Sequence, residues 1–465
     1  MKFINTKKRE TICIQGLGYV GAAMSILVAS TVKNKEPIFN VYGLELNNKI
    51  GKKKIKQLNS GNFIANIADD KLKKSIKLVK KNKNFYATSN KKVIANSDII
   101  ICNINLDIKK KNLDCDFKSF KTAIVTISKY ISENSLLIVE STVPPGTCEK
   151  IILPLIKAEF IKRKINTSKI LLAHSFERVM PGENYLDSIK NYWRVYSANN
   201  IRAAIKCRNF YNKIINTKKF KLVKLKSMRD SEFCKILENT YRAVNIAFID
   251  EWSRFAENIN VNMFEVINAI KLRRTHSNIM SPGFGVGGYC LTKDPLFGFI
   301  SANKIFKKST IKFPMTFLAS NINDNMPISS FKILKKELKT LKNKKILIFG
   351  VTYKENIGDC RYSPSVYFAR ILEKSGAIVF AYDPMIKTWS EHKNLNVTAM
   401  PNFKEIDALV LAVRHSHFTK LNFEKLLKFN SKIIILDTFN ILTQKQILQI
   451  NKIKCKLISI GKGIQ

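Results

Sequence analysis

The sequence predicts an α/β protein in which two doubly wound, Rossmann-like domains are joined by a central helical segment with one long helix. Short apolar runs of strand length alternate with helical patterns over residues 1–215 and again over residues 336–465, as in parallel sheets covered by helices. In the part between, apolar residues recur every three or four positions from Ser231 to about Asn258, which is the period of an amphipathic helix. We therefore expect three parts, 1–215, 216–335 and 336–465.

The first predicted strand runs directly into a glycine-rich turn. Residues 11–15 predict a buried strand, residues 16–21 read GLGYVG, and residues 22–29 predict a helix. In this setting the GxGxxG pattern is typical of a dinucleotide site, because the glycines admit a pyrophosphate and the helix N-terminus attracts it. The predicted cofactor-binding residues here are Gly16, Gly18, Tyr19, Val20 and Gly21.

An acidic residue ends the second predicted strand, residues 39–45. Glu45 lies somewhat further from the glycines than the acid usual in such folds. A carboxylate at this place accepts hydrogen bonds from both ribose hydroxyls and repels a 2′-phosphate. NAD is therefore the expected cofactor, in preference to NADP.

Polar segments follow the later strands of the first domain. Strands are predicted at 98–103, 136–140 and 169–173, and the last two run into residues 141–147 and 174–182. The carboxyl ends of parallel strands are where ligands bind in an open sheet. The resulting prediction is a ligand site at these segments, with Thr147 as the N-cap of the helix that follows.

The central segment begins with the long helix and carries two polar residues on an otherwise apolar pattern. Lys235 and Asn239 are four residues apart, so they lie one turn apart on one face. More helix is expected to about residue 272 and again over residues 295–341. A helical segment of this length often supplies a subunit interface, so a homodimer is expected.

A glycine-rich loop that ends in a cysteine lies inside this segment. Glycines stand at 283, 285, 287 and 288, Cys290 follows, and Asp294 comes four residues later. Glycine lets the backbone approach a ligand closely, and a helical turn from Cys290 would bring the carboxylate to the same face. The spacing alone leaves two interpretations open, a nucleophilic thiol or a buried structural cysteine.

The third part resumes the α/β pattern. Its predicted helix begins at Pro364 and its predicted strands are 345–350, 377–382, 408–412 and 433–437.

The composition narrows the function classes. The net charge is +45, but the lysines are spread along the whole chain and no helix-turn-helix, RRM or zinc pattern is present, so a compositional habit is favoured over nucleic-acid binding. No apolar run has the length of a membrane span and the first residues lack a signal peptide, so a cytoplasmic protein without membrane insertion is expected. The nine cysteines show no CxxC pair, which favours free thiols, and no metal is expected.

A series of motifs in a fixed order resembles the UDP-glucose/GDP-mannose dehydrogenase family of nucleotide-sugar 6-dehydrogenases over nearly the full length. The motifs are GLGYVG, then ESTVPPGT at 140–147, ERVMPG at 177–182, KILENTYRAVN at 235–245, GFGVGGYCLTKDP at 283–295, YKEN at 353–356 and DCRYSP at 359–364. The resemblance implies two successive NAD-dependent oxidations at one site. The sugar C6 alcohol becomes an aldehyde, a cysteine adds to it, a second hydride leaves, and the thioester is hydrolysed to a carboxylate.

The resemblance also implies roles for individual residues. Cys290 matches the nucleophile, and Glu177 matches the acid/base residue of thioester hydrolysis. The polar cluster that holds a water and stabilises the alkoxide or oxyanion is matched by Lys235, Asn239, Asp294 and Thr142. Cofactor contacts are expected from Thr142 and from Asn105, which stands where many members carry threonine.

Substrate contacts are implied in the same way. The matching residues are Glu177, Arg178, Val179, Lys235, Asn239, Arg274, Gly285, Gly287, Gly288, Tyr353, Lys354 and Arg361. Arg274 resembles an arginine that reaches the neighbouring subunit's nucleotide sugar, although a solvated basic helix face explains it equally well.

The sugar is the finest point of the prediction. ERVMPG resembles the form found in members that act on UDP-N-acetylhexosamines, and 437–440 lacks the Gly-Arg pair of the UDP-glucose branch. We expect oxidation of a UDP-N-acetylhexosamine for surface polysaccharide or lipopolysaccharide synthesis. The alternatives are a UDP-glucose or GDP-mannose 6-dehydrogenase, and a single-step dehydrogenase of the 6-phosphogluconate or hydroxyacid type.

Overall fold

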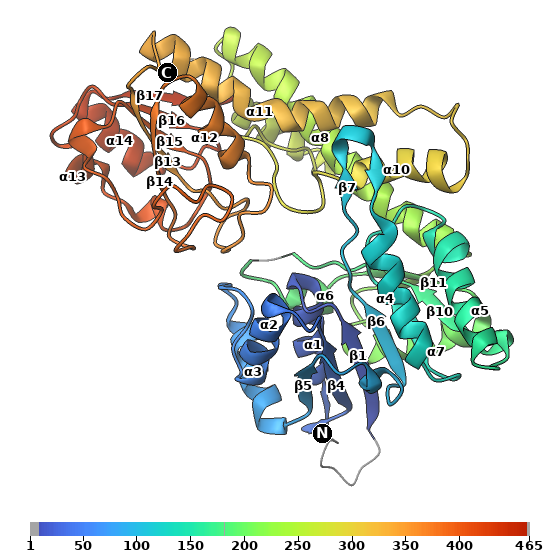
Figure 1. The fold of residues 1–465 in the computed structure, drawn as a ribbon. Helices are drawn as coiled ribbons and strands as arrows, with labels where there is room; N and C mark the ends of the chain where they lie inside the picture. The colour runs from blue at the N-terminus through green and yellow to red at the C-terminus, as the bar shows by residue number, and fades with distance from the viewer. Residues whose placement is uncertain (1–8, 181, 463–465) are drawn as a thin grey trace. The chain divides into compact units, whose positions relative to one another are not determined.

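The computed structural model describes residues 9–180 and 182–462, which form two compact units. The first unit comprises Met1–Glu238 with Leu296–Lys312, and the second comprises Asn239–Pro295 with Phe313–Gln465. The long helix α8 (Met228–Asn258) belongs partly to each (Figure 1). The segment expected between the two domains is thus shared by the two units.

The first unit is built on an eight-stranded sheet in the order β12-β11-β10-β9-β6-β1-β4-β5. Six of these strands, from β10 to β5, are parallel and have the sequential order of a doubly wound dinucleotide-binding fold, with β1 and β6 at its switch point. β11 pairs antiparallel with β10 and parallel with β12. The strands are β1 (Glu10–Gln15), β4 (Phe39–Leu44), β5 (Phe85–Thr88), β6 (Ile99–Cys102), β9 (Leu136–Val139), β10 (Leu171–His174), β11 (Arg194–Ala198) and β12 (Leu222–Lys224).

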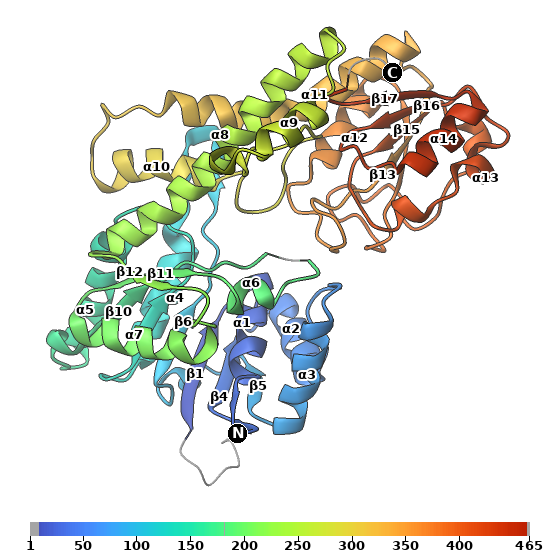
Figure 2. The ribbon, with the colours of Figure 1, turned by 180° about the vertical axis from the view of Figure 1, so that it is seen from behind.

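Helices cover both faces of this sheet (Figure 2). On one face, Ile12 and Ile14 of β1 lie in a core with α1 (Tyr19–Ala29), α3 (Asp70–Asn82) and α7 (Ile201–Ile214). On the other face, Cys13 lies with α4 (Phe117–Tyr130) and α5 (Leu153–Lys162). Both faces of β1 are buried along its middle, which explains why residues 12–14 are all apolar. The remaining helices of the unit are α2 (Lys49–Asn59), α6 (Asp187–Lys190) and α10 (Phe297–Ile300).

The second unit contains a five-stranded parallel sheet in the order β14-β13-β15-β16-β17. This is the other common doubly wound order, and its switch point lies between β13 and β15. The predicted α/β class with two doubly wound sheets is therefore confirmed. The strands are β13 (Lys345–Phe349), β14 (Ile378–Tyr382), β15 (Ala408–Leu411), β16 (Ile434–Asp437) and β17 (Lys456–Ser459), and the helices are α9 (Met263–Lys271), α11 (Pro314–Leu338), α12 (Pro364–Lys374), α13 (Phe423–Leu427) and α14 (Gln444–Ile453).

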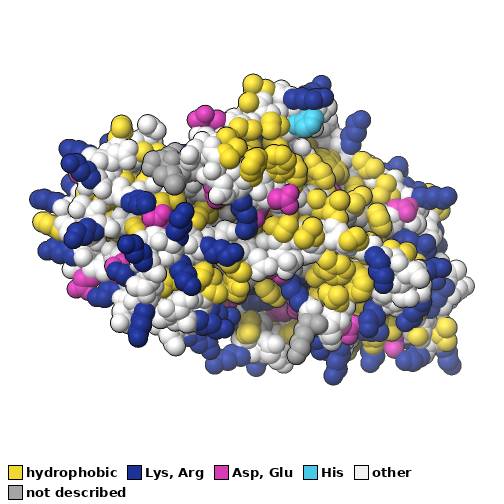
Figure 3. All heavy atoms as spheres, turned by 90° about the horizontal axis from the view of Figure 1, so that it is seen from above, with side chains coloured by type: hydrophobic (Ala, Val, Ile, Leu, Met, Phe, Trp, Pro, Cys, Tyr) yellow, Lys and Arg dark blue, Asp and Glu magenta, His cyan; other side chains and the backbone are white. Residues whose placement is uncertain are grey.

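Helix α8 ends at the predicted residue and starts three residues before the predicted one. Its large apolar side chains include Tyr241, Phe248, Trp252 and Phe255, each about half exposed. Hydrophobic side chains gather on one face of the protein, among Lys and Arg side chains (Figure 3). Among the described residues, no helix is both long enough and apolar enough to cross a membrane.

Candidate functional site

The glycine-rich turn after β1 has the shape that a pyrophosphate needs. Gly16 has φ +93°, and a Cβ on Gly21 would lie 2.0 Å from the Gly16 carbonyl oxygen, so neither position accepts a side chain without a shift. No atom lies within 4 Å of where a Cβ on Gly18 would be, so open space borders the backbone there. Helix α1 begins at Tyr19 and presents its N-terminus at this place. These residues fit the predicted dinucleotide.

The carboxylate of Glu45 braces this turn from the end of β4. One of its oxygens, Oε2, accepts from the Leu17 N–H at 3.0 Å and from Lys54 Nζ at 2.9 Å, and Oε1 accepts from the Leu46 N–H. The Glu45 side chain is only 10% exposed. Glu45 is thus held beside the phosphate-binding turn, where an acid can meet an adenosine ribose. The contact with Lys54 is a feature that the sequence pattern did not reveal.

A buried ion pair organises the carboxyl ends of the neighbouring strands. Glu140, at the end of β9, is fully buried and pairs with Arg194 of β11. Its carboxylate also accepts from the Tyr211 hydroxyl at 2.9 Å and from Asn103 Nδ2 at 3.1 Å. Burial raises the pKa of Glu140, and the charge of Arg194 opposes that rise. The first residue of the ESTVPPGT motif therefore fixes the strand ends from which the loops start.

Two loops leave this buried network side by side. The Ile104 N–H donates to Ser141 Oγ at 3.0 Å, which ties the segment after β6 to the segment after β9. Thr142 follows and is half-buried, and Asn105 is exposed. Both residues lie on loops at the cofactor end of the sheet.

The predicted residues Lys235 and Glu177 form one polar group in the first unit. Lys235 is nearly buried, its Nζ donates to the Glu177 carbonyl oxygen at 3.3 Å, and it lies 3.6 Å from Glu177 Oε1. The Glu177 carboxylate also accepts from the Val179 N–H. Arg178 packs its guanidinium on the Trp193 ring at 3.9 Å and pairs with Glu238 at 2.8 Å. Pro181, within the same motif, lies outside the described residues.

Thr147 occupies the N-cap position predicted for it, but its side chain does not cap the helix. Its hydroxyl donates to the Pro144 carbonyl oxygen at 2.6 Å. The carboxylate of Glu232, from α8, accepts the N–H groups of Gly146 and Cys148 instead. A distant acid therefore supplies the cap.

The cysteine loop forms a turn in the second unit, and at this turn the side chains of Asn239, Lys293 and Asp294 come together. The N–H groups of Lys293 and Asp294 donate to the Cys290 carbonyl oxygen at 3.1 and 2.8 Å, so the predicted turn from Cys290 is present. The buried Asp294 carboxylate accepts from Asn239 Nδ2 at 2.8 Å and from Lys293 Nζ at 2.6 Å. Cys290 is exposed, whereas Cys13, Cys102 and Cys207 are buried.

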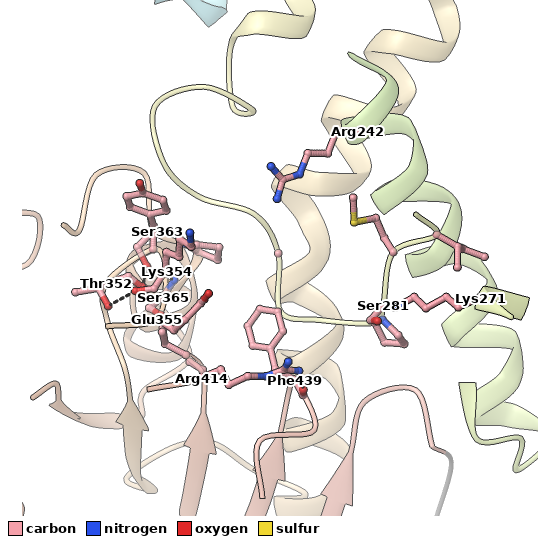
Figure 4. A pocket seen from close by; sticks show the side chains of 18 residues that line it. Arg242, Lys271, Ser281, Thr352, Lys354, Glu355, Ser363, Ser365, Arg414 and Phe439 are labelled. Carbon is pink, nitrogen blue, oxygen red and sulfur yellow. Dashed lines mark hydrogen bonds between the residues drawn. The ribbon is translucent and has the colours of Figure 1, made fainter. Parts of the chain in front are cut away.

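A pocket of about 410 Å³ lies at the carboxyl ends of β13, β15 and β16, the switch point of the second sheet. Its lining includes the predicted substrate residues Gly285, Tyr353 and Lys354. Figure 4 shows Arg242 on the α8 side of the pocket and Lys354 and Arg414 on the side of the sheet. The lining also includes Lys271, and such a set of cations suits the phosphates of a nucleotide. Arg414, which follows strand β15, was not predicted.

The other predicted substrate residues have different surroundings. Arg361 pairs with Asp359 at 2.7 Å, and Arg274 is exposed and is not among the residues that line the pocket. A Cβ on Gly287 would lie 2.5 Å from the Tyr362 carbonyl oxygen, and a Cβ on Gly288 would lie 2.7 Å from the Tyr353 ring. These two glycines are therefore required by the packing of their loop against residues 353–362.

Three family models match the chain. They are described as the NAD binding domain (residues 10–215), the central domain (229–325) and the UDP binding domain (347–444) of the UDP-glucose/GDP-mannose dehydrogenase family. A UDP-N-acetyl-D-mannosamine dehydrogenase of Methanocaldococcus jannaschii is 32% identical over 94% of this chain and 93% of its own.

Solved structures agree with these matches. The UDP-D-ManNAc dehydrogenase from Pyrococcus horikoshii is 28% identical, with a TM-score of 0.79 over 97% of this chain and 99% of its own. A UDP-glucose dehydrogenase from Pyrobaculum islandicum, 20% identical, has the same fold with a TM-score of 0.82 over the whole of both chains.

Proposed function

We propose that this chain, which belongs to the UDP-glucose/GDP-mannose dehydrogenase family, oxidises C6 of a UDP-N-acetylhexosamine to the uronic acid through a thioester on Cys290. The observation that carries the proposal is the turn that presents the exposed Cys290 next to the buried Asp294. The ERVMPG motif and the relatives named for UDP-N-acetyl-D-mannosamine support the acetamido sugar.

The first oxidation needs a group that stabilises the alkoxide formed at C6. Bound NAD accepts the hydride in each of the two oxidations, so one alcohol, two NAD and one water give one carboxylate, two NADH and three protons. Lys235, nearly buried beside Glu177, supplies a positive charge that stabilises a developing oxyanion strongly in a site shielded from water. Thr142, on the loop after β9, is proposed to share this role and to contact the cofactor.

The second oxidation uses the cysteine. The Cys290 sulfur adds to the C6 aldehyde, and loss of the second hydride leaves a thioester. Hydrolysis needs an ordered water, which a carboxylate can hold and deprotonate. Glu177 is proposed as the acid/base residue of this step. Asn239 and Lys293 both donate to the Asp294 carboxylate and hold it in place. The role proposed for Asp294 is to position these two side chains near the thiol.

The nucleotide is proposed to bind in the pocket of the second unit. Its cations suit a diphosphate, and Arg242 and Arg414 can each offer two N–H groups to phosphate oxygens. By role, the chain divides into an NAD-binding part (1–215), a central part with the cysteine loop (216–335) and a part that binds the nucleotide sugar (336–465).

A homodimer and a cytoplasmic location complete the proposal. The half-exposed apolar side chains of α8, such as Tyr241 and Trp252, support a second copy as the occupant of this face. A catalytic thiol has to stay reduced, which supports the cytoplasm. The product class supports a place in surface polysaccharide synthesis.

The substrate is tested by measuring kcat/KM for NADH release with UDP-ManNAc, UDP-GlcNAc, UDP-GalNAc, UDP-glucose and GDP-mannose. A site that hydrogen-bonds an acetamido group disfavours a plain hexose, because its polar partner is then left unpaired. The proposal predicts that one of the three acetamido sugars is the best substrate. A clear preference for UDP-glucose or GDP-mannose refutes the acetamido assignment and leaves the family unchanged.

A further inference from the structure

A fully buried carboxylate joins helix α8 to the loop after β9. Glu232 is 0% exposed, its Oε2 accepts from the Gly146 N–H at 2.5 Å, and its Oε1 accepts from the Cys148 N–H at 2.7 Å. These N–H groups stand at the start of the helical turn Cys148–Ile152 that continues into α5, where backbone donors have no partner within the helix. Because both oxygens accept, the arrangement is that of the ionised carboxylate.

The loop that Glu232 holds has little freedom elsewhere. Gly146 has φ +89°, and a Cβ there would lie 2.6 Å from the Phe306 ring. Ser301 Oγ donates to the Pro145 carbonyl oxygen at 2.7 Å. The loop is therefore packed from one side and tied to α8 through Glu232.

The two ends of this connection carry residues that matter for the reaction. Thr142 lies four residues before Gly146, and Lys235 lies three residues after Glu232, on nearly the same side of α8. Glu232 thus lies on a short path of contacts between these two residues.

We propose that Glu232 is a positioning residue: its ionised carboxylate holds the Thr142 loop against the turn of α8 that carries Lys235, and protonation loosens this connection. The inference rests on the proposed function for the roles of Thr142 and Lys235 only. A protonated acid keeps one oxygen as an acceptor, because the other becomes a hydroxyl, so one of the two N–H groups loses its partner.

The surroundings make this carboxyl a group that changes charge near neutral pH. Burial raises the pKa of Glu232 to about 7. Burial also raises the pKa of the adjacent Cys148 thiol well above its usual value, so the thiol is neutral. His174 contacts Ser231, the residue before Glu232 on α8, and burial lowers the pKa of His174 to about 3, so it is neutral too. On the solvent side Glu149 pairs at 2.6 Å with Arg229 of α8, three residues before Glu232, and the other α8 cation near Glu232 in sequence is Lys235, three residues after it.

The test compares E232Q with E149Q, a matched change on the same turn that leaves the two backbone contacts intact. In wild type and E149Q, we expect kcat to rise with increasing pH, and the midpoint of this rise should give an apparent pKa near 7. In E232Q the amide accepts at one oxygen only, so kcat should be lower on the order of tenfold. The rise of kcat with pH should also be absent in this variant. E232D keeps a titrating carboxylate and should restore part of the rise of kcat with pH.

A readout independent of turnover is amide hydrogen exchange at Gly146 and Cys148, corrected for the intrinsic effect of pH. Wild type should protect both amides above about pH 8 and lose protection as Glu232 gains its proton. E232Q should lack full protection at every pH. Unchanged protection across this range in wild type, or an E232Q enzyme that keeps the wild-type pH profile, overturns the inference. If E232Q does not fold, wild type and E232D decide it. An enzyme inactive on all nucleotide sugars that still shows pH-dependent protection refutes the proposed function and leaves the connection intact.

Discussion

The pair formed by Lys235 and Glu177 allows charge stabilisation in the reaction to be separated from stabilisation of the fold. Replacing Lys235 with Met keeps the length of the side chain and removes its charge. At 3.6 Å and an effective dielectric constant of about 20, the attraction between Nζ and Oε1 is ~5 kcal/mol. Each side chain is only 11% exposed, so removing one partner leaves the other buried without compensation, at an expected cost of about 3 kcal/mol in unfolding free energy.

The same substitution should slow turnover on the order of 10²–10³-fold, because it removes one preorganised charge from the oxyanion. Urea unfolding gives the stability and NADH release gives kcat. In the double variant K235M/E177Q most of the stability should return, because no buried charge is left alone, while the activity should stay low. The control is K206M, which removes a half-buried lysine that donates to the Asn134 carbonyl oxygen. A K235M enzyme with unchanged kcat refutes the role of the charge, and an unchanged free energy of unfolding refutes the coupling with Glu177.

Three further outcomes are expected. E45Q should lower the preference for NAD over NADP, measured as the ratio of kcat/KM values, by about tenfold or more, because the amide no longer repels a 2′-phosphate; an unchanged ratio contradicts this. Burial lowers the pKa of His174 to about 3 in the folded protein, so the unfolded chain takes up the proton first as the pH falls below about 6.5. The free energy of unfolding should therefore fall by roughly 5 kcal/mol in all between pH 6.5 and pH 3. Acid unfolding of H174N should therefore be less steep than that of wild type, and equal slopes would exclude this origin. R414M should raise KM for the nucleotide sugar about tenfold with little change in kcat, and a pure kcat effect would contradict a phosphate contact.

Much of the fold follows from local patterns. The strands β1, β4, β6 and β13 are short apolar runs followed by turns, and the GxGxxG turn stands where the backbone has positive φ at Gly16. The partition of the central segment could not be predicted in this way, because a helical period says which face is apolar and not which unit covers it. The division of α8 between the two units was therefore not predicted from the sequence.

The site shows the same limit. Cys290 and Asp294 are four residues apart, so a single turn relates them, and the turn is present. Arg414 comes from a distant part of the chain, and only the order of the strands brings it to the pocket. Lys54 is nine residues from Glu45, but only the fold of the turn between β4 and α2 brings the two side chains together. Thr147 failed as a cap because a buried carboxylate from another helix competes for the same N–H groups.

The central claim is that Cys290 carries the second oxidation. The most direct measurement is the amount of NADH and of carboxylate formed per nucleotide sugar consumed, in wild type and in C290A, with NAD binding measured for both. The account predicts two NADH and one carboxylate for wild type, and no carboxylate for C290A with unchanged NAD binding. One NADH per sugar in wild type, or a C290A enzyme that makes the uronic acid at nearly the wild-type rate, would contradict it.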